Sequence, residues 1–380
     1  PLYRSDTSDQ RISTYCQRTQ MRVTRSKGFI LAHKQGKSYG FGLIGAGMIG
    51  KMHAEVVKEL SNAHLAAVTA LPFEAAQVFA KEYGGCAYAS VDELLADPDV
   101  DIVTICTPSG LHPQQAIAAA KAGKHVLIEK PIGISLEGAD AAIAAAREAG
   151  VKLGVISQRR FDLPCKALKQ AIDSGEFGQL ILVNGFVKYY RESSYYSSSN
   201  WRGTWALDGG GALMNQGVHT VDLVRWLGGP VKSVSGYART LSHDIEVEDT
   251  ASAAIEFENG ALGSIQATTS ASPGLYISVE ILGDKGSAIL KDSDLIYWMT
   301  ETRDHPPLEE GARTGSGSRD PMAFSAAGHL AQFTDFLQAI QDDRDPIVCG
   351  KEGRDTLELV LAVYESSRTG TKTHLPLLKP

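Results

Sequence analysis

The chain has 380 residues, of which 43% are hydrophobic, so it can bury a sizeable core and form roughly two domains. Its formal net charge of −7 gives no bulk reason to expect nucleic acid or an anionic membrane as a partner. No apolar run approaches the roughly 20 residues that span a bilayer. Five cysteines, odd in number and without metal-ligand spacing, exclude a zinc site and are typical of reduced thiols. We therefore expect a cytoplasmic protein that binds a small molecule and no metal.

Residues 1–37 differ from the rest of the chain because basic side chains far outnumber acidic ones there. A basic segment rich in Ser and Gln favours a disordered tail, or an upstream start-site artefact, over a nucleic-acid-binding arm. We leave this segment out of the predicted fold. Its basic residues are Arg4, Arg11, Arg18, Arg22, Arg25, Lys27, Lys34 and Lys37, against Asp6 and Asp9.

Strands and helices alternate from residue 38 to about residue 160. The apolar strand YGFGLI runs into the glycine turn GAGMIG and a helix, and further strands are predicted in HLAAVTAL, DIVTICTP, HVLIEKP and KLGVISQ. Helical patterns such as PFEAAQVFAKEYG and SLEGADAAIAAAREAG separate them. This rhythm predicts an α/β Rossmann domain over 38–160, a doubly wound parallel sheet that binds a dinucleotide.

The pattern changes after residue 160. One helix, CKALKQAIDSG, precedes long β-rich runs such as QLILVNGFVKYY, VKSVSGYART and ALGSIQATTS. They predict a C-terminal α+β domain over 161–380 with a large, mostly antiparallel open sheet, which serves substrate binding and oligomerisation. An open sheet face must be covered, so we expect a homodimer or homotetramer.

The glycine turn is the first candidate binding site. In such a turn the first glycine allows the tight bend, the second lets a pyrophosphate approach, and the third lets helix pack on strand. NAD enzymes usually carry an acid at the end of the second strand, but Ala70 stands there and no Arg or Lys is near to hold a 2′-phosphate. We predict NAD, with NADP left open. The turn residues expected to bind it are Gly45, Gly47, Met48, Ile49 and Gly50.

Two later strands end in polar residues at the same carboxyl edge of the sheet, where ligands bind in this architecture. TPSGLH follows the strand DIVTIC, and Glu129 and Lys130 of EKP follow HVLI. A charged strand end before a turn is the structural alternative for Lys130. The residues that these segments contribute to the predicted cofactor site are Thr107, Pro108, His112, Glu129 and Lys130.

The segment GGGALMNQGVHTVD carries the candidate base. On a helix, the spacing of four places Asn215 and His219 on one face. Oxidising an alcohol requires a base for the hydroxyl proton, and a neutral His suits neutral pH. A Lys ammonium can stabilise the developing charge on oxygen, a role that Lys130 fits. The alternatives are a structural helix histidine at His219 and, at Asn215, a helix N-cap or a structural hydrogen bond. Asp222 would orient His219 or simply lie at the surface.

The glycine turn, AGKHVLIEKP and GGGALMNQGVHTVDLVRWLGG together resemble the glucose-fructose oxidoreductase / inositol dehydrogenase (Gfo/Idh/MocA) family over about residues 38–380. The resemblance implies an NAD(P)-dependent oxidoreductase with Lys130 beside the nicotinamide and His219 as general base. The position of Asn215 is commonly Asp in the inositol-dehydrogenase branch, and Ser109 stands where Asn is common. The family's Trp-Arg segment, which borders cofactor and substrate, corresponds to Trp201 and Arg202.

The main hypothesis is a dehydrogenase that oxidises a ring hydroxyl of a sugar or cyclic polyol such as an inositol. Aromatic and guanidinium groups near residue 190 suit sugar rings and phosphates. WRGTW and GGGALMNQGVH also resemble the branch of the family that oxidises the 3-hydroxyl of nucleotide-linked amino sugars, which implies a nucleotide-sugar 3-dehydrogenase as the second hypothesis. A redox-neutral glycoside hydrolase or lyase that retains NAD, and a non-catalytic dinucleotide-binding regulator, are further alternatives. The predicted catalytic residues are Lys130, His219 and Asn215, and the predicted substrate-binding residues are Tyr190, Arg191, Arg202, Asn215 and His219.

Overall fold

The computed structural model describes residues 37–307 and 326–377. The predicted tail, 1–37, lies outside these ranges except for its last residue, so its disorder stays a prediction. No helix in the described ranges is both long and apolar enough to cross a membrane.

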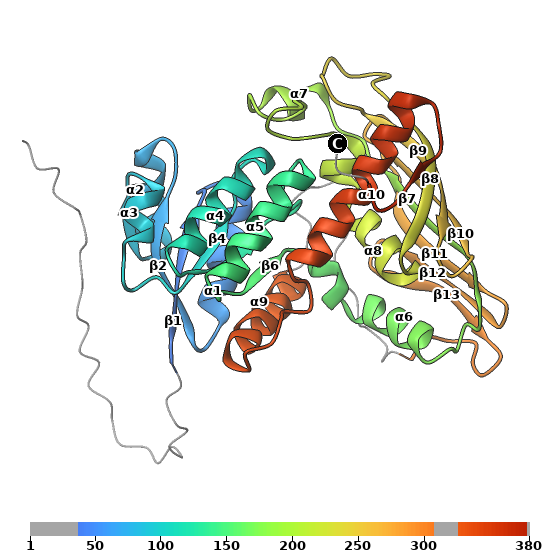
Figure 1. Ribbon diagram of the computed structural model, residues 1–380, viewed down its shortest axis with the longest axis horizontal. Helices are drawn as coiled ribbons and strands as arrows, with labels where there is room; N and C mark the ends of the chain where they lie inside the picture. Colours follow the sequence, from blue (N-terminus) through green and yellow to red (C-terminus); the bar gives the residue numbers. More distant parts are fainter. Residues whose placement is uncertain (1–36, 308–325, 378–380) are drawn as a thin grey trace, which may run out of the picture.

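The first part of the chain forms a six-stranded, fully parallel sheet in the order β3-β2-β1-β4-β5-β6. It belongs to the blue to teal part of the molecule in Figure 1. The strand order reverses between β1 and β4, so the loops that follow these two strands lie together at the carboxyl edge. This confirms the predicted Rossmann fold. The strands are β1 (Tyr39–Ile44), β2 (Ala63–Thr69), β3 (Cys86–Tyr88), β4 (Ile102–Ile105), β5 (His125–Ile128) and β6 (Leu153–Val155).

Helices alternate with these strands as the sequence predicts. The central strands are buried on both faces, as expected for a parallel sheet covered by helices. Ser90 and Ser135 cap two of the helices, each accepting a hydrogen bond from a main-chain N–H three residues on. The helices are α1 (Met48–Glu59), α2 (Phe73–Tyr83), α3 (Val91–Leu95), α4 (His112–Lys121) and α5 (Leu136–Glu148), with a short 3₁₀ turn η1 (Ser109–Leu111).

The second sheet has eight strands in the order β13-β12-β11-β7-β10-β9-β8-β14. Only the pair β7 and β10 is parallel, which confirms a mostly antiparallel second sheet. The strands are β7 (Leu180–Lys188), β8 (Val231–Arg239), β9 (Thr250–Phe257), β10 (Leu262–Thr268), β11 (Ile277–Gly283), β12 (Gly286–Lys291), β13 (Asp294–Thr300) and β14 (Thr373–His374).

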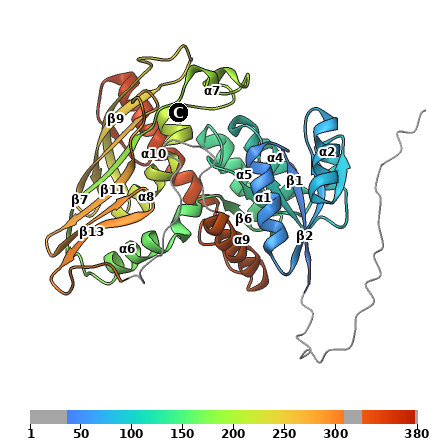
Figure 2. The same ribbon diagram turned by 180° about the vertical axis from the view of Figure 1, so that it is seen from behind.

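Helices cover the face of this second sheet that is turned toward the first domain, and both views show its outer face without a helix (Figure 2). Apolar side chains on its strands, among them Leu262 and Ile296, are more than half exposed. The homodimer or homotetramer that would cover them stays a prediction. The helical elements of this part are η2 (Gln158–Phe161), α6 (Leu163–Asp173), α7 (Ser193–Ser197), η3 (Ala212–Gln216), α8 (Val218–Gly228), α9 (Ala326–Gln341) and α10 (Gly350–Thr369).

The chain returns to the first domain after the second sheet. Helix α9 packs against α1, and the Phe333 ring stacks on Phe41 of β1 with ring centroids 5.7 Å apart. Phe333 and Phe336 belong to the same buried cluster as Phe41 and Leu43. Part of the segment 161–380 therefore completes the core of the dinucleotide-binding domain.

The cysteines follow the sequence-based expectation only in part. Cys106, Cys165 and Cys349 carry free thiols. Cys86 is disulfide-bonded, so the expectation of reduced thiols is wrong at that position.

Candidate active site

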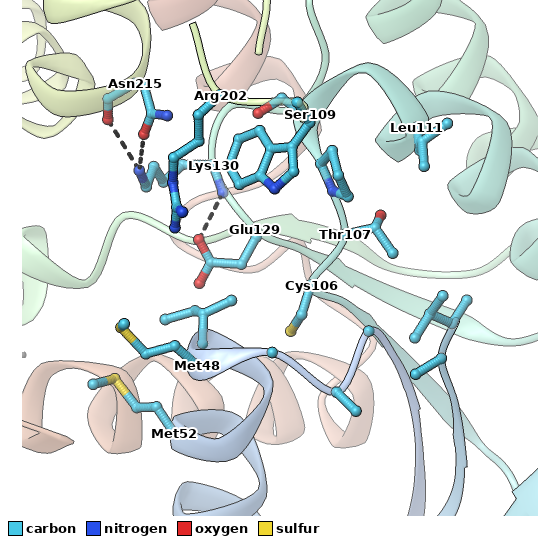
Figure 3. Close-up of a pocket in the computed structure, with 18 of the residues that line it drawn as sticks. Met48, Met52, Cys106, Thr107, Ser109, Leu111, Glu129, Lys130, Arg202 and Asn215 are labelled. Carbon is cyan, nitrogen blue, oxygen red and sulfur yellow. Dashed lines mark hydrogen bonds between the residues drawn. The ribbon is translucent and has the colours of Figure 1, made fainter. Parts of the chain in front are cut away.

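A cavity of about 1250 Å³ opens at the carboxyl edge of the first sheet, where the loops after β1, β4 and β5 meet residues of the second domain (Figure 3). This is the edge at which ligands bind in doubly wound folds. Three predicted residues, Gly50, His112 and Tyr190, do not line the cavity. The predicted residues that do line it are Gly45, Gly47, Met48, Ile49, Thr107, Pro108, Glu129, Lys130, Arg191, Trp201, Arg202, Asn215 and His219.

The glycine turn fits the pyrophosphate of a dinucleotide. Gly45 has a φ of +106°, and a Cβ atom on it would lie 2.7 Å from the main-chain oxygen of Cys106. A Cβ on Gly47 would meet nothing within 4 Å, and α1 begins at the next residue without a side-chain cap on its amides. Free amides at a helix N-terminus attract anions. A Cβ on Gly50 would lie 2.2 Å from the oxygen of Gly45, so Gly50 serves helix packing.

The end of β2 offers no acid for a ribose hydroxyl. Ala70 follows the strand directly and lines the cavity between Thr69 and Leu71, while Glu74 does not line it. Glu129 is the one carboxylate among the described lining residues, and no Lys or Arg comes from this end. The structure thus places Ala70 where the sequence pattern put it, without a charged residue that would select between the two nicotinamide dinucleotides.

Glu129 forms a buried pair with His53 of α1. His53 Nε2 lies 3.0 Å from a Glu129 carboxylate oxygen, and its Nδ1 lies 2.7 Å from the Thr104 hydroxyl and 3.2 Å from Cys106 Sγ. Burial acts to raise the pKa of Glu129, but His53 holds it below its usual range. Burial acts to lower the pKa of His53, and Cys106 and Glu129 more than reverse this. The negative charge of Glu129 is therefore compensated within the cavity wall.

Lys130 reaches from the end of β5 toward the segment that carries His219. Its ammonium donates to the main-chain oxygen of Asn215 at 3.0 Å and to the side-chain oxygen of Asn215 at 3.4 Å. Figure 3 shows both contacts as dashed lines. Burial lowers the pKa of Lys130, although the charges of Glu129 and Asp208 oppose this. Lys130 is thus held at the cavity by an amide rather than by a carboxylate.

Asn215 and His219 do not share one helix, so the expectation from their spacing is wrong. Asn215 lies in η3, a π-helical turn, and Gly217 separates this turn from α8, which begins at Val218. Gly217, not Asn215, is the N-cap of α8. The alternative role of Asn215 as a helix cap is therefore also wrong.

Glu248, which is far from the π-helical turn in sequence, holds the backbone of this turn by direct hydrogen bonds. The main-chain N–H groups of Gly211 and Leu213 donate to its two carboxylate oxygens at 2.9 and 2.8 Å. A Cβ on Gly211 would lie 1.9 Å from the main-chain oxygen of Glu248. Gly211 therefore allows a close approach of backbone to backbone.

His219 lies in the first turn of α8 and lines the cavity. Burial and then the charge of Lys130 lower the pKa of His219 to about 3. The imidazole is therefore neutral at pH 7 and can accept a proton. No hydrogen bond of its ring lies within the described part of the chain, so its two nitrogens are not committed to protein partners.

Asp222 does not orient His219. Both of its oxygens accept hydrogen bonds from Arg160, at 2.8 and 2.5 Å, and it also accepts from Ser157 and Thr356. Burial acts to raise the pKa of Asp222, but Arg160 holds it below its ordinary value. Asp222 is buried, so the surface alternative is wrong as well.

His112 and Tyr190 lie outside the cavity for different reasons. The ring nitrogens of His112 lie 2.7 Å from the main-chain oxygen of Pro131 and 2.8 Å from that of Thr107, so His112 connects the two loops that carry cavity residues. Tyr190 is 37% exposed and pairs with Ser270 at the end of the second sheet.

Several cavity residues were not predicted. Tyr195 of α7 accepts a hydrogen bond from Gln216 at 2.7 Å. The guanidinium groups of Arg191 and Arg202 pack on its ring, with their Cζ atoms 5.5 and 4.6 Å from the ring centroid. The clustering of aromatic and basic residues in YYRESSYY was the available signal. Other lining residues outside the prediction include Gln158, Ser198 and Asn200.

Comparison with known proteins agrees with this geometry. Residues 39–157 match an oxidoreductase family with an NAD-binding Rossmann fold, and residues 165–289 match the GFO/IDH/MocA C-terminal domain. The chain is 30% identical to the myo-inositol 2-dehydrogenase of Thermotoga maritima over 86% of this chain and 95% of that protein. It is 29% identical to the scyllo-inositol 2-dehydrogenase (NAD(+)) of Bacillus subtilis over 88% of this chain and 95% of that protein.

A solved structure is also similar over nearly the whole fold. The WlbA dehydrogenase from Bordetella pertussis, in complex with NADH and UDP-GlcNAcA, is 35% identical and superimposes with a TM-score of 0.82. The similarity covers 90% of this chain and 99% of that one.

Proposed function

Because this chain belongs to the GFO/IDH/MocA family of NAD-dependent oxidoreductases, we propose that it oxidises a secondary ring hydroxyl of a sugar or cyclic polyol, with His219 as base and Lys130 polarising the reacting oxygen. The observation that carries the proposal is that His219 and Lys130 line the same cavity as the glycine turn. NAD, when bound, supplies the hydride acceptor.

The chain's own residues can manage the proton and the charge. An ammonium group has three N–H donors, and Asn215 accepts from Lys130 with two oxygens, so one donor remains for the substrate oxygen. That donor would stabilise alkoxide character as the hydroxyl proton leaves. His219 is neutral, lines the cavity and has no hydrogen bond to another described residue, so its ring can receive the proton.

Substitution of Lys130 tests the proposal. First, sugars, inositols and nucleotide sugars are screened with NAD and with NADP for absorbance of reduced nicotinamide. With the best substrate, Lys130→Met should lower kcat by about 10²- to 10³-fold, as loss of a charge-stabilising donor does, and leave the Kd for NAD nearly unchanged. Lys121→Met, an exposed lysine of α4, is the matched control.

Wild-type kcat in Lys130→Met would contradict the assignment of Lys130. Turnover of substrate without net accumulation of reduced nicotinamide would instead support the redox-neutral alternative. The screen therefore separates a failure of the residue assignment from a failure of the reaction class.

A second candidate, a dehydrogenase of nucleotide sugars or other anionic sugars, is favoured by two guanidinium groups. In the described ranges, neither Arg191 nor Arg202 has an ion pair with a carboxylate, and the Nε of each has no hydrogen-bond partner. Arg191 is only 5% exposed and belongs to the second domain, away from the glycine turn. A buried cation without an anion beside it suits a phosphate or carboxylate of the substrate.

Arg191→Gln tests this second candidate. If an anionic sugar is the substrate, kcat/KM for it should fall about tenfold to a hundredfold, the worth of a charged hydrogen bond, while the KM for NAD stays constant. Equal kcat/KM for neutral and anionic sugars in the unsubstituted enzyme would contradict it.

A further inference from the structure

Asp208 lies behind the cavity wall and was not among the predicted site residues. It is 1% exposed and does not line the cavity. One carboxylate oxygen accepts the N–H of Gly203 at 2.9 Å, and the other accepts Nδ2 of Asn215 at 2.6 Å. In the described part of the chain, no Lys or Arg forms an ion pair with this carboxylate.

The contact with Asp208 determines how the Asn215 amide is oriented. A carboxylate only accepts hydrogen bonds and an ammonium only donates them. The amide nitrogen must therefore face Asp208, which leaves the amide oxygen for Lys130. The three groups form a chain of carboxylate, amide and ammonium that ends at the cavity.

We propose that Asp208 is a positioning residue of the dehydrogenase: through the Asn215 amide it holds the Lys130 ammonium at the reacting oxygen. This inference rests on the proposed function of Lys130. The amide between the two charges prevents a direct ion pair that would occupy Lys130. It also leaves the third donor of the ammonium free for the substrate.

Protonation of Asp208 should break this chain. A neutral acid can donate to the amide oxygen, and the amide would then turn its NH₂ group toward Lys130, where a donor faces a donor. Burial raises the pKa of Asp208 to about 6, against the lowering effect of its hydrogen bonds. We therefore expect kcat to fall below about pH 6.

Other charged and titratable groups lie near the hydrogen-bonded chain of Asp208, Asn215 and Lys130. His219 is already neutral far below pH 6, so it does not produce the same acid limb. The groups facing Asp208 are Lys130, Arg202, Tyr196 and Tyr364. Those facing Lys130 are Glu129, Asp208, Arg191, Arg202, His219 and His112.

Exchanging the two side chains tests the proposal. The full chain, Asp208→Asn, Asn215→Asp and the double variant are compared by their pH profiles of kcat, with the best substrate of the screen. Asp208→Asn should lose the acid limb and about 10²-fold of kcat, the scale expected for a misplaced reacting group. Asn215→Asp places two carboxylates in contact and should move the limb to higher pH. The double variant places the carboxylate at position 215, in direct contact with Lys130, so it should keep the low kcat of Asp208→Asn.

Lys130 labelling gives a readout that needs no turnover. The rate at which acetic anhydride modifies Lys130, followed by mass spectrometry across pH, reports the pKa of its amine. Asp208→Asn removes a charge that raises this pKa, so Lys130 should react faster near neutral pH.

Two results would overturn the proposal: a wild-type acid limb and labelling profile in Asp208→Asn, or wild-type kcat in the double variant. If the unsubstituted chain reduces no NAD with any substrate, the proposed function fails, and the labelling profile alone decides whether Asp208 controls Lys130.

Discussion

Two buried aspartates flank the candidate catalytic segment and have opposite environments. Asp222 follows His219 and has both oxygens bound by the Arg160 guanidinium. Asp208 precedes Asn215 and accepts only from a neutral main-chain N–H and a neutral amide. Burial acts on both carboxyls, yet the pKa of Asp222 is lowered and that of Asp208 is raised to about 6.

The difference shows that burial alone does not decide what a carboxylate does. A guanidinium beside Asp222 compensates its charge at every pH of interest, so this pair belongs to the scaffold between η2 and α8. Asp208 has no guanidinium partner among the described residues, and burial raises its pKa to about 6. Groups with raised pKa values beside a cavity are typical of functional sites, where stability is sacrificed for activity.

The largest expected effect is that of Asp222→Ala. Removing one member of a buried ion pair leaves the other charge uncompensated, which costs about 3–5 kcal/mol. Arg160 keeps Glu352 at 2.7 Å, so we expect the lower end of this range. Because the folded pKa of Asp222 is lowered, its stabilisation is present above the unfolded value of about 3.9 and is lost as the pH falls below it.

Urea unfolding at about pH 7 and about pH 3 measures this effect. The difference between wild type and Asp222→Ala should be large at the higher pH and smaller, by about 1 kcal/mol at most, at the lower. A loss below about 1 kcal/mol at pH 7 would remove the distinction between the two aspartates.

Asp208→Asn should raise the free energy of unfolding, whereas Asp222→Ala lowers it. Since its folded pKa is raised, the folded state binds a proton more tightly than the unfolded state between about pH 4 and 6, and wild-type stability falls as the pH rises through that window. Replacing the carboxylate removes a cost of at most about 3 kcal/mol, for a difference of about two pKa units.

Thermal unfolding of both proteins from about pH 4 to about pH 8 checks this sign. The Tm of Asp208→Asn should exceed that of wild type above pH 6 and approach it near pH 4. A lower Tm at about pH 7.5 would mean that the negative charge of Asp208 stabilises the fold, as that of Asp222 does.

The loops that carry the glycine turn, Thr107 and Lys130 were predictable because their sequence motifs are local. The spacing of Gly45, Gly47 and Gly50 specifies a turn whose geometry depends on a few neighbouring residues. Apolar strands that end in Thr107 and Lys130 placed these residues at one sheet edge, since parallel strands share a direction. The predicted cavity residues of the glycine turn, TPSGLH and EKP followed from this.

The surroundings of Asn215, Asp208 and Asp222 depend on contacts between residues far apart in the sequence, which no local pattern predicts. The turn that holds Asn215 is shaped by Glu248, about thirty residues later in the chain, so spacing alone predicted a helix instead. Asp208 and Asp222 look alike in sequence, and only their partners, Asn215 and Arg160, distinguish them. Residues paired over such separations come from packing of the whole domain.

Thr356→Val should have the smallest effect on stability. It tests whether the neutral donors of Asp222 matter as much as those of Asp208. Thr356 donates to Asp222 at 2.8 Å, but the Arg160 guanidinium would still bind both carboxylate oxygens. We expect a loss of about 1 kcal/mol in unfolding free energy, the usual worth of one hydrogen bond, with kcat and its pH profile unchanged. Enzyme assays across pH, alongside urea unfolding, measure both quantities. A neutral donor is dispensable where a cation already compensates the carboxylate, whereas Asp208 depends on its neutral donors entirely. A shifted pH profile in Thr356→Val would therefore place Asp222 in the reaction and end its assignment to the scaffold.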